Sequence, residues 1–201
     1  NLMYAFSADQ HKPGYYRILP GNIRDVKAFK VSVEELGISN TVVIADKGFG
    51  SEQNFELLEK SELNYIIPLR RNNGHCDRTK IVSGNKANFD GYFLFNGRAI
   101  WYYEYMQDNK RFIMYLDETL KAKEERDYLQ RLEANNEKYT HEGFMEKQNS
   151  FGTIAFHTNL KDDAKEFYAL YKTRGEIEQS FQIAGDQNVH RGGHGQIEFT
   201  V

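Results

Sequence analysis

The amino-terminal part of the chain alternates between strand-like and helix-like patterns of hydrophobic positions. Leu2, Tyr4 and Phe6 recur at every second position, a polar turn follows, and residues 15–19 return as a strand, so a β-hairpin is predicted. A helix is predicted for residues 25–37. Residues 41–45 form an uninterrupted apolar run, which is typical of a strand covered on both faces and paired in parallel within an α/β layer.

The pattern changes after residue 72. A helix capped by Ser51 and a strand at residues 65–69 precede this point. Residues 91–117 contain three aromatic-rich stretches separated by the turn dipeptides Asn96-Gly97 and Asp108-Asn109. These features predict an antiparallel meander with strands at residues 92–95, 98–106 and 111–116.

The rest of the pattern returns to alternating elements. A charged helix is predicted for residues 118–137, a strand for 151–156 and a long helix for 162–183. We therefore expect four parts, which are the first part of an α/β core (1–72), a β-rich insertion with one charged helix (73–150), the last strand and helix of the core (151–183) and an irregular, glycine-rich tail (184–201).

Composition narrows the class of protein. The 201 residues include 14 Phe and 13 Tyr, which favours a folded domain over a disordered chain. The single cysteine, Cys76, excludes an intrachain disulfide and makes the cytoplasm the expected compartment. No apolar run approaches the roughly 20 residues of a membrane span, so no membrane association is expected. The net charge of −3 argues against tight non-specific nucleic-acid binding by this chain alone.

Asp46 is the first candidate for chemistry. It directly follows the apolar run and precedes the turn Lys47-Gly48-Phe49-Gly50. Ligands of open α/β sheets gather at the carboxyl ends of strands, and a carboxylate placed there suits a hard cation such as Mg²⁺. The alternative is an aspartate that caps the local turn.

The last predicted helix carries a second candidate group. At about 100° per residue, Tyr171, Arg174, Glu178 and Phe181 occupy one stripe. One interpretation is an ordinary amphipathic helix with an i,i+4 Arg–Glu pair. The other is an acid on the buried side of the helix, oriented by the guanidinium and facing another acid across the sheet, because a buried charge requires a partner or a metal.

Together these segments resemble the DDE transposases encoded by bacterial insertion sequences. Residues 44–49, with the sequence Ile-Ala-Asp-Lys-Gly-Phe, are similar to the segment that carries the second aspartate of that family. Tyr171-x2-Arg174-x3-Glu178 matches the first three positions of the Y-x2-R-x3-E-x6-K signature of one large group. Residues 19–25 and 156–160 resemble segments that precede these two motifs, so the resemblance spans residues 1–183.

The resemblance implies a ribonuclease-H-like fold with a β-rich insertion before the glutamate helix. In such proteins three acids hold two divalent metals, Mg²⁺ or Mn²⁺, for cleavage and transfer of DNA strands at transposon ends. The resemblance implies that Asp46 is the second acid and Glu178 the third, and that both are metal ligands. It also implies that Tyr171 and Arg174 contact DNA phosphate or position the glutamate. The resemblance further implies a homodimer of the full-length protein, associated with the bacterial nucleoid. Arg70, Arg71, Lys121, Lys123, Arg126 and Arg131 are additional candidate phosphate contacts.

The sequence departs from the family pattern at three positions. In the family, the first catalytic aspartate lies on a strand that comes before the segment matched by residue 1. In the family's sheet, that strand lies between the hairpin and the strand that leads to Asp46. Asp9 and Asp25 fall in a turn and at a helix start and do not replace it. The signature lysine position is Gly185, and a position that is commonly tryptophan is Gly175.

These departures leave three hypotheses. The first is a fragment of a transposase catalytic core that lacks the first core strand. The second is a catalytically inactive transposase remnant that acts only as a fold or interaction module. The third is an unrelated α/β metal-dependent hydrolase that uses Asp46 and Glu178.

Overall fold

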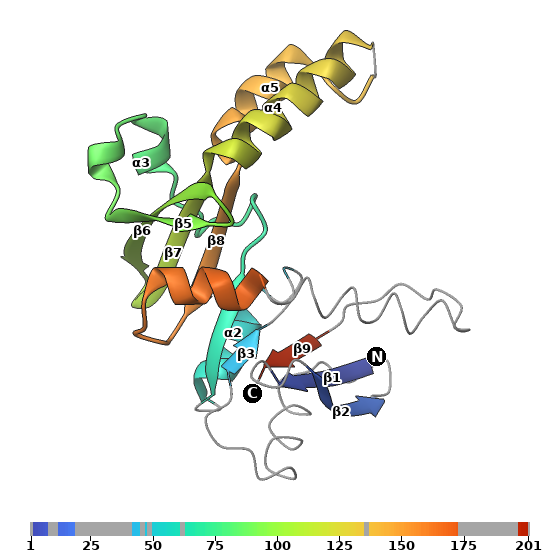
Figure 1. Ribbon diagram of the computed structural model, residues 1–201, viewed down its shortest axis with the longest axis vertical. Helices are drawn as coiled ribbons and strands as arrows, with labels where there is room; N and C mark the ends of the chain where they lie inside the picture. The colour runs from blue at the N-terminus through green and yellow to red at the C-terminus, as the bar shows by residue number, and fades with distance from the viewer. Residues whose placement is uncertain are drawn as a thin grey trace. The chain divides into compact units, whose positions relative to one another are not determined.

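The computed structural model describes residues 2–7, 12–18, 42–44, 47, 50–60, 63–134, 137–172 and 197–200 (Figure 1). The chain divides into two compact units. The first contains Asn1–Pro68 and His157–Val201, and the second contains Leu69–Phe156. The mixture of helices with parallel and antiparallel strands confirms the expected α/β class with a mixed sheet.

The first unit is built on a mixed sheet. β1 (Leu2–Ser7) and β2 (Lys12–Ile18) form the predicted antiparallel hairpin. β3 (Val42–Ile44) and β4 (Asn64–Pro68) are parallel, as the apolar run predicts. The strands follow the order β2-β1-β9-β3-β4, so β9 (Ile197–Thr200) lies between the hairpin and β3.

β9 lies within residues 184–201, for which the sequence predicts an irregular tail. In the structure, residues 197–200 are a strand, parallel to β1 and antiparallel to β3. The apolar residues Ile197 and Phe199 alternate with polar ones, but four residues next to a glycine-rich stretch are too short for the pattern to be recognised. The open edges of β1 and β3 supply the partners that the local sequence does not specify. The predicted helix at residues 25–37 lies outside the described residues.

Two helices of the first unit carry apolar stripes. α2 (Glu52–Lys60) follows Ser51, whose carbonyl accepts a hydrogen bond from the Phe55 amide at 3.0 Å. Phe55 and Leu58 are fully buried. A second helix covers residues 164–172 of the span predicted as 162–183. Its buried residues recur at helical spacing and are Ala164, Phe167 and Tyr168.

The second unit contains the predicted aromatic meander. β5 (Gly91–Phe95), β6 (Arg98–Gln107) and β7 (Lys110–Asp117) pair antiparallel, and β8 (Thr153–Thr158) continues the order as β8-β7-β6-β5. The two turns of the meander contain the residues with positive φ that tight hairpins require, namely Asn96, Gly97, Asp108 and Asn109. The turn dipeptides therefore predicted both the positions and the chemistry of these connections.

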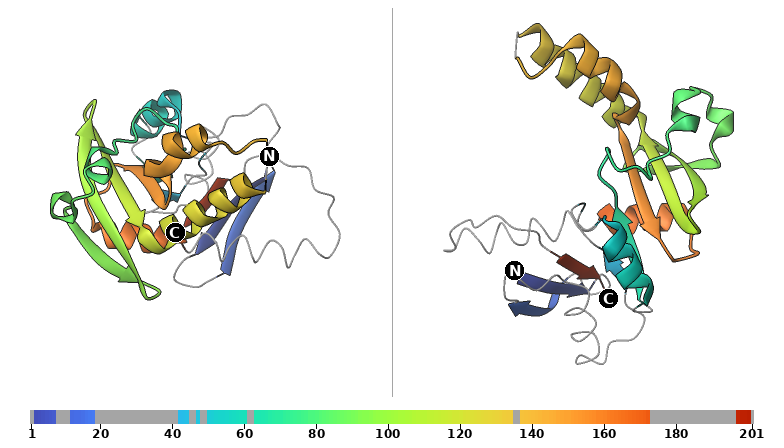
Figure 2. Two further views of the ribbon diagram at one scale, coloured as in Figure 1. Left: turned by 90° about the horizontal axis from the view of Figure 1, so that it is seen from above. Right: turned by 180° about the vertical axis from the view of Figure 1, so that it is seen from behind.

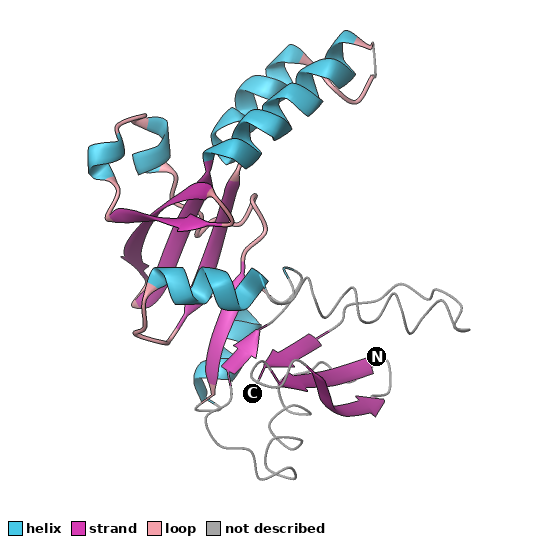
Figure 3. Ribbon diagram, viewed as in Figure 1, coloured by secondary structure: helices cyan, strands magenta, loops and turns pink. Residues whose placement is uncertain are grey.

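The second unit also contains helices (Figure 3). α4 (Glu118–Glu133) is the predicted charged helix, and α5 (His141–Lys147) lies beside it (Figure 2). The ring of Tyr128 on α4 contacts the rings of Phe144 and Phe151, with centroids 5.6 and 5.9 Å apart. α5 escapes sequence prediction because it is seven residues long and contains only two large apolar residues. The short elements are α3 (Thr79–Val82) and the 3₁₀ turns Lys86–Asn88 and Gln148–Ser150.

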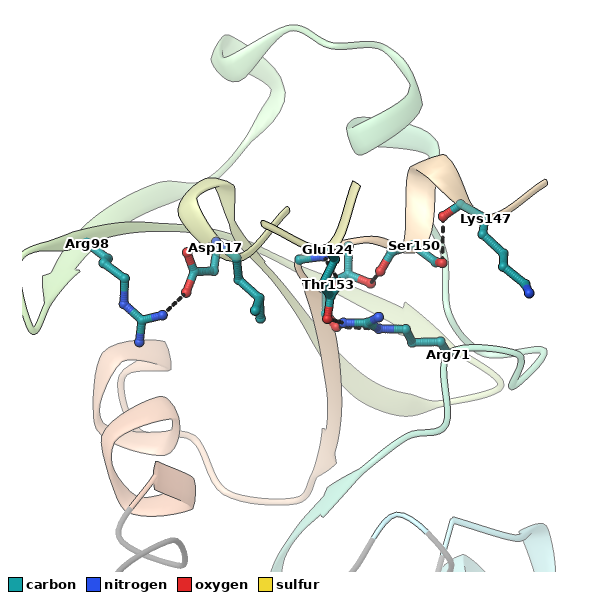
Figure 4. A network of polar contacts seen from close by, with 9 residues as sticks. Arg71, Arg98, Asp117, Glu124, Lys147, Ser150 and Thr153 are labelled. Atoms are coloured by element: carbon teal, nitrogen blue, oxygen red, sulfur yellow. Dashed lines mark hydrogen bonds and ion pairs between the residues drawn. The ribbon is translucent and has the colours of Figure 1, made fainter. Parts of the chain in front are cut away.

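A polar network fixes the start of α4 against β8 (Figure 4). The buried Asp117 accepts a hydrogen bond from the Leu120 amide at 2.9 Å and pairs with Arg98 at 2.8 Å. Glu124 accepts from the Gly152 amide at 2.7 Å and from Arg71 at 2.9 Å. Helix capping and ion pairing thus converge where the helices leave the sheet.

Gly152 is the position in this network that only glycine tolerates. Its φ is +68°, and a Cβ there would lie 2.4 Å from the Asp117 carbonyl oxygen and 2.7 Å from the Lys121 amide nitrogen. The Gly152 carbonyl also accepts a hydrogen bond from the Asp117 amide at 2.9 Å. The close approach of two backbones therefore depends on the absence of a side chain.

We expect Gly152→Ala to lower the free energy of unfolding by about 2 kcal/mol or more, because left-handed backbone strain and a backbone clash add together. Urea denaturation measures this change. Gly84→Ala is the matched control in the same unit, since Gly84 has φ +64° and nothing within 4 Å of its added Cβ. The control is expected to cost about 1 kcal/mol, and equal losses in the two variants would contradict the close approach.

Candidate functional site

The segment that leads to Asp46 is a strand buried on both faces. β3 ends at Ile44, two residues before Asp46, which itself lies outside the described residues. Val43 and Ile44 are each 1% exposed, and successive strand residues point to opposite faces. β3 is parallel to β4, so the carboxyl ends of both strands lie at the same edge of the sheet. The described end of β3 at Ile44 thus lies at the kind of edge where α/β proteins bind ligands.

The helix that contains Tyr171 has a defined start. The Asp163 carboxylate accepts a hydrogen bond from the Lys165 amide at 2.9 Å, and the Asp163 carbonyl accepts one from the Glu166 amide at 3.0 Å. Tyr171 lies within the helix of residues 164–172 and is half-buried. Arg174 and Glu178 lie outside the described residues, so the stripe shared by these three side chains stays a prediction.

The segment His157-Thr158-Asn159 holds the first unit together at the start of β4. The Thr158 hydroxyl donates to the Tyr65 carbonyl oxygen at 2.7 Å and accepts from the Leu160 amide at 3.1 Å. The Asn159 side-chain oxygen accepts from the Tyr65 amide at 3.0 Å, and its side-chain nitrogen donates to the Leu63 carbonyl at 2.8 Å. We call this set of contacts the Thr158–Asn159 clamp. Side chains here replace the ladder hydrogen bonds that a longer strand would supply.

His157 belongs to the core beneath the clamp. Its side chain is buried, its Nε2 shares a hydrogen bond of 3.0 Å with the Tyr65 hydroxyl, and its ring meets Phe55 of α2 edge-on at 4.5 Å. Burial raises the pKa of the Tyr65 hydroxyl, and the nearby Glu59 raises it further. Tyr65 therefore stays protonated at ordinary pH, which suits a structural hydrogen bond between β4 and β8.

The sequence identified the segment around His157 but missed Tyr65, its main partner. The clamp joins residues more than ninety positions apart in the sequence. A local sequence pattern cannot predict such a pairing. The available signal was chemical, because a strand that ends in Thr-Asn offers a hydroxyl and an amide for backbone hydrogen bonds.

Several of the additional basic candidates are engaged within the second unit. Arg71 pairs with Glu124 at 2.9 Å, and Lys121 lies 3.8 Å from Glu125. Arg131 donates a hydrogen bond to the Tyr139 hydroxyl. These contacts give the three cations a role in holding the α4 region.

The described part of the chain shows neither a metal-binding cluster nor a membrane-spanning helix. Within it, no three His, Cys, Asp or Glu side chains gather as a metal-binding group. A metal site formed by Asp46 and Glu178 would use residues beyond this part. None of the helices described is long and apolar enough to cross a membrane.

We expect Thr158→Val to lower the free energy of unfolding by about 1–3 kcal/mol, because it removes two hydrogen bonds from a buried position at nearly constant volume. Amide exchange at Leu160 should accelerate in this variant. Thr158→Ser keeps the hydroxyl and is expected to preserve Leu160 protection despite the lost methyl group. Unchanged Leu160 exchange in Thr158→Val would show that the clamp does not exist in solution.

Comparison with known proteins identifies the family of the chain. The family model described as the transposase DDE domain matches residues 1–192, which include β3, Asp46, the Thr158–Asn159 clamp and Glu178. Neither the curated proteins nor the solved structures contain a significant match to the chain. Because the family model covers nearly the whole sequence, the chain belongs to the transposase DDE domain family.

Proposed function

We propose that this transposase domain carries out metal-dependent cleavage and transfer of DNA strands at transposon ends, with Asp46 and Glu178 as catalytic acids. The observation that carries the proposal is the family match over residues 1–192, which contains both acids. The parallel, doubly covered β3 supports it, because this strand ends two residues before Asp46. The family match argues against the hypothesis of an unrelated metal-dependent hydrolase, since the family is a transposase family.

The chemistry of the two proposed ligands fits a hard divalent cation. Carboxylate oxygens are the donors that Mg²⁺ and Mn²⁺ prefer, and neither sulfur nor imidazole is required. When bound, such ions activate the attacking oxygen and stabilise the leaving oxygen in phosphodiester chemistry. The role of Asp46 and Glu178 is then to place negative charge at the edge of the sheet where β3 ends.

Tyr171 and Arg174 are proposed to contact the DNA backbone. Tyr171 lies half-buried on the helix of residues 164–172, and Arg174 follows three positions later. A guanidinium offers a planar fork of donors that matches phosphate oxygens. We also propose that the full-length protein acts as a homodimer, because transposition joins two transposon ends.

A second candidate function is that of a transposase domain that keeps the fold without catalysis. β9 favours it, since this strand lies between β1 and β3, where the resemblance places the strand of the first catalytic aspartate. The residues of β9 are Ile197, Glu198, Phe199 and Thr200, and none is an aspartate.

The two candidates are separated by nicking of supercoiled DNA in the presence of Mn²⁺. We expect the chain to nick this DNA and Glu178→Gln to lower the nicking rate by about 100-fold or more, as loss of a charge-stabilising catalytic group does. The matched control is Glu166→Gln, the same change at an exposed position of the same predicted helix, which should leave the rate unchanged.

Each result of this assay has a defined meaning. Equal nicking by the chain and by Glu178→Gln would refute the role of that glutamate. Absence of nicking by the unaltered chain, with Mg²⁺ and with Mn²⁺, would favour the inactive domain.

Arg174 is tested separately through binding. We expect Arg174→Ala to weaken binding to duplex DNA and to reduce the slope of log Kd against log salt concentration by about one, the loss of one phosphate contact. Arg174→Lys keeps the charge and should largely restore the slope while losing the bidentate geometry. An unchanged slope in Arg174→Ala would contradict a phosphate contact at this residue.

A further inference from the structure

The strand order of the second unit ends at β5, which is paired on one side only. β5 lies next to β6, and no described strand lies on its other side (Figure 1). Two of its residues carry large apolar side chains that are mostly exposed to solvent, since Tyr92 is 62% and Leu94 66% exposed. Both side chains lie on one face of the sheet, because successive strand residues point to opposite faces. β5 thus combines an open backbone edge with an exposed apolar surface.

The other open edge among the described strands is protected, whereas the edge at β5 is not. β2 ends the strand order of the first unit, and its sequence contains Lys12, Pro13 and Arg17. Charged residues and proline are devices by which edge strands avoid pairing with other chains. Residues 91–97 have the sequence Gly-Tyr-Phe-Leu-Phe-Asn-Gly and contain neither a charge nor a proline. This composition favours pairing of the β5 edge with a further strand.

The turn after β5 determines which backbone groups point outward. Phe95 and Arg98 are paired and flank the two-residue turn Asn96-Gly97. In a hairpin of this kind the flanking pair exchanges both hydrogen bonds, and hydrogen-bonded pairs then alternate with pairs that are not hydrogen-bonded. By this alternation, the amide and carbonyl groups of Tyr92 and Leu94 are directed away from β6. The outward backbone groups therefore belong to the two residues whose side chains are exposed.

These outward groups are complementary to those of an identical strand. Antiparallel pairing about a twofold axis at Phe93 places Tyr92 opposite Leu94 of a second copy, so that the outward amides and carbonyls exchange hydrogen bonds. Directly opposite residues share a face, and an aromatic ring beside an aliphatic side chain is a favourable cross-strand pair. The Tyr92 ring already packs against Trp101 of β6, with centroids 5.1 Å apart, so the pairing extends an existing apolar contact.

Symmetry and charge select this register among those that use the same outward groups. A twofold axis at Tyr92 would place Leu94 opposite the charged Asp90 of the second copy, which removes the apolar contact. An axis at Leu94 would place Tyr92 opposite Asn96, whose φ of +48° belongs to the turn rather than to a strand. With the axis at Phe93, each residue of β5 is opposite a residue of β5, and no charged residue enters these rows.

We propose that β5 is the interface between two copies of this chain, which pair antiparallel about a twofold axis at Phe93. The partner is a second copy because β5 is complementary to itself in length, in charge and in its outward hydrogen-bonding groups. Each copy offers one such unprotected edge among its described strands, so the assembly closes as a dimer. The inference rests on the homodimer proposed above and specifies its interface, and it makes no use of Asp46 or Glu178.

Sedimentation velocity of the full chain at increasing concentration tests the interface. We expect a dimer, and we expect Leu94→Lys to raise its dissociation constant by about tenfold or more, because a charge then occupies the edge of each copy. The matched control is Met106→Lys, the same change at a residue that is also 66% exposed and lies beyond the part of β6 that pairs with β5. The control should leave the constant unchanged. A chain that stays monomeric at every concentration, or equal effects of the two substitutions, would overturn the proposal.

Cysteine pairing between chains tests the register, with Cys76→Ser in every chain to remove the native thiol. Chains carrying Tyr92→Cys are mixed with chains carrying Leu94→Cys and are oxidised mildly. We expect the mixed disulfide to exceed each symmetric disulfide by about tenfold, because only positions 92 and 94 are directly opposite. Mass spectrometry distinguishes the three products. Predominance of a symmetric disulfide, or the absence of any disulfide between chains, would overturn the proposed pairing.

These results are read independently of the nicking assay. Circular dichroism verifies that each variant is folded, as expected for substitutions at exposed positions. A chain that nicks DNA but stays monomeric would refute the β5 interface alone. A chain that dimerises through β5 without nicking DNA would support the interface and would favour the inactive domain.

Discussion

The structure of the first unit depends on one constraint, which is that β3 must be paired on both edges and covered on both faces. Val43 and Ile44 are buried on opposite faces, and the three residues of β3 pair with β4 on one side and β9 on the other. An unpaired backbone group in such surroundings costs as much as a lost hydrogen bond. The strand that leads to Asp46 is therefore positioned by its neighbours rather than by its own length.

The Thr158–Asn159 clamp applies the same constraint on the far side of β4. Thr158 and Asn159 satisfy the backbone of Leu63 and Tyr65 at the point where the chain turns toward the helix of residues 164–172. The chain leaves the first unit after Pro68 and returns to it at His157. The second unit, between these points, is held by its own network around Asp117 and Gly152. A sizeable insertion is compatible with this fold because its entry and exit strands are fixed by hydrogen bonds.

Turn residues and local patterns of apolar positions predicted most helices and strands. The remaining strand, β9, depends on pairing with residues far away in the sequence. The Asn96-Gly97 and Asp108-Asn109 turns gave the meander, since their residues adopt the positive φ that hairpins demand. β9 was missed because its strand character comes from the edges of β1 and β3. For the site, the sequence supplied Asp46, Tyr171, Arg174 and Glu178 through spacing and resemblance. Of these the structure describes Tyr171, together with the strand that precedes Asp46.

The strand next to β3 also connects the architecture with the proposed chemistry. The proposed chemistry requires that the carboxylate of Asp46 belongs to a group of oxygen ligands, and the neighbouring strands of β3 determine which residues flank that strand. With β9 in place, the row of Ile44 contains Glu198 and Tyr4. The fold and the proposed catalysis therefore make different demands on the sequence, because backbone pairing satisfies the first and only side-chain identity can satisfy the second.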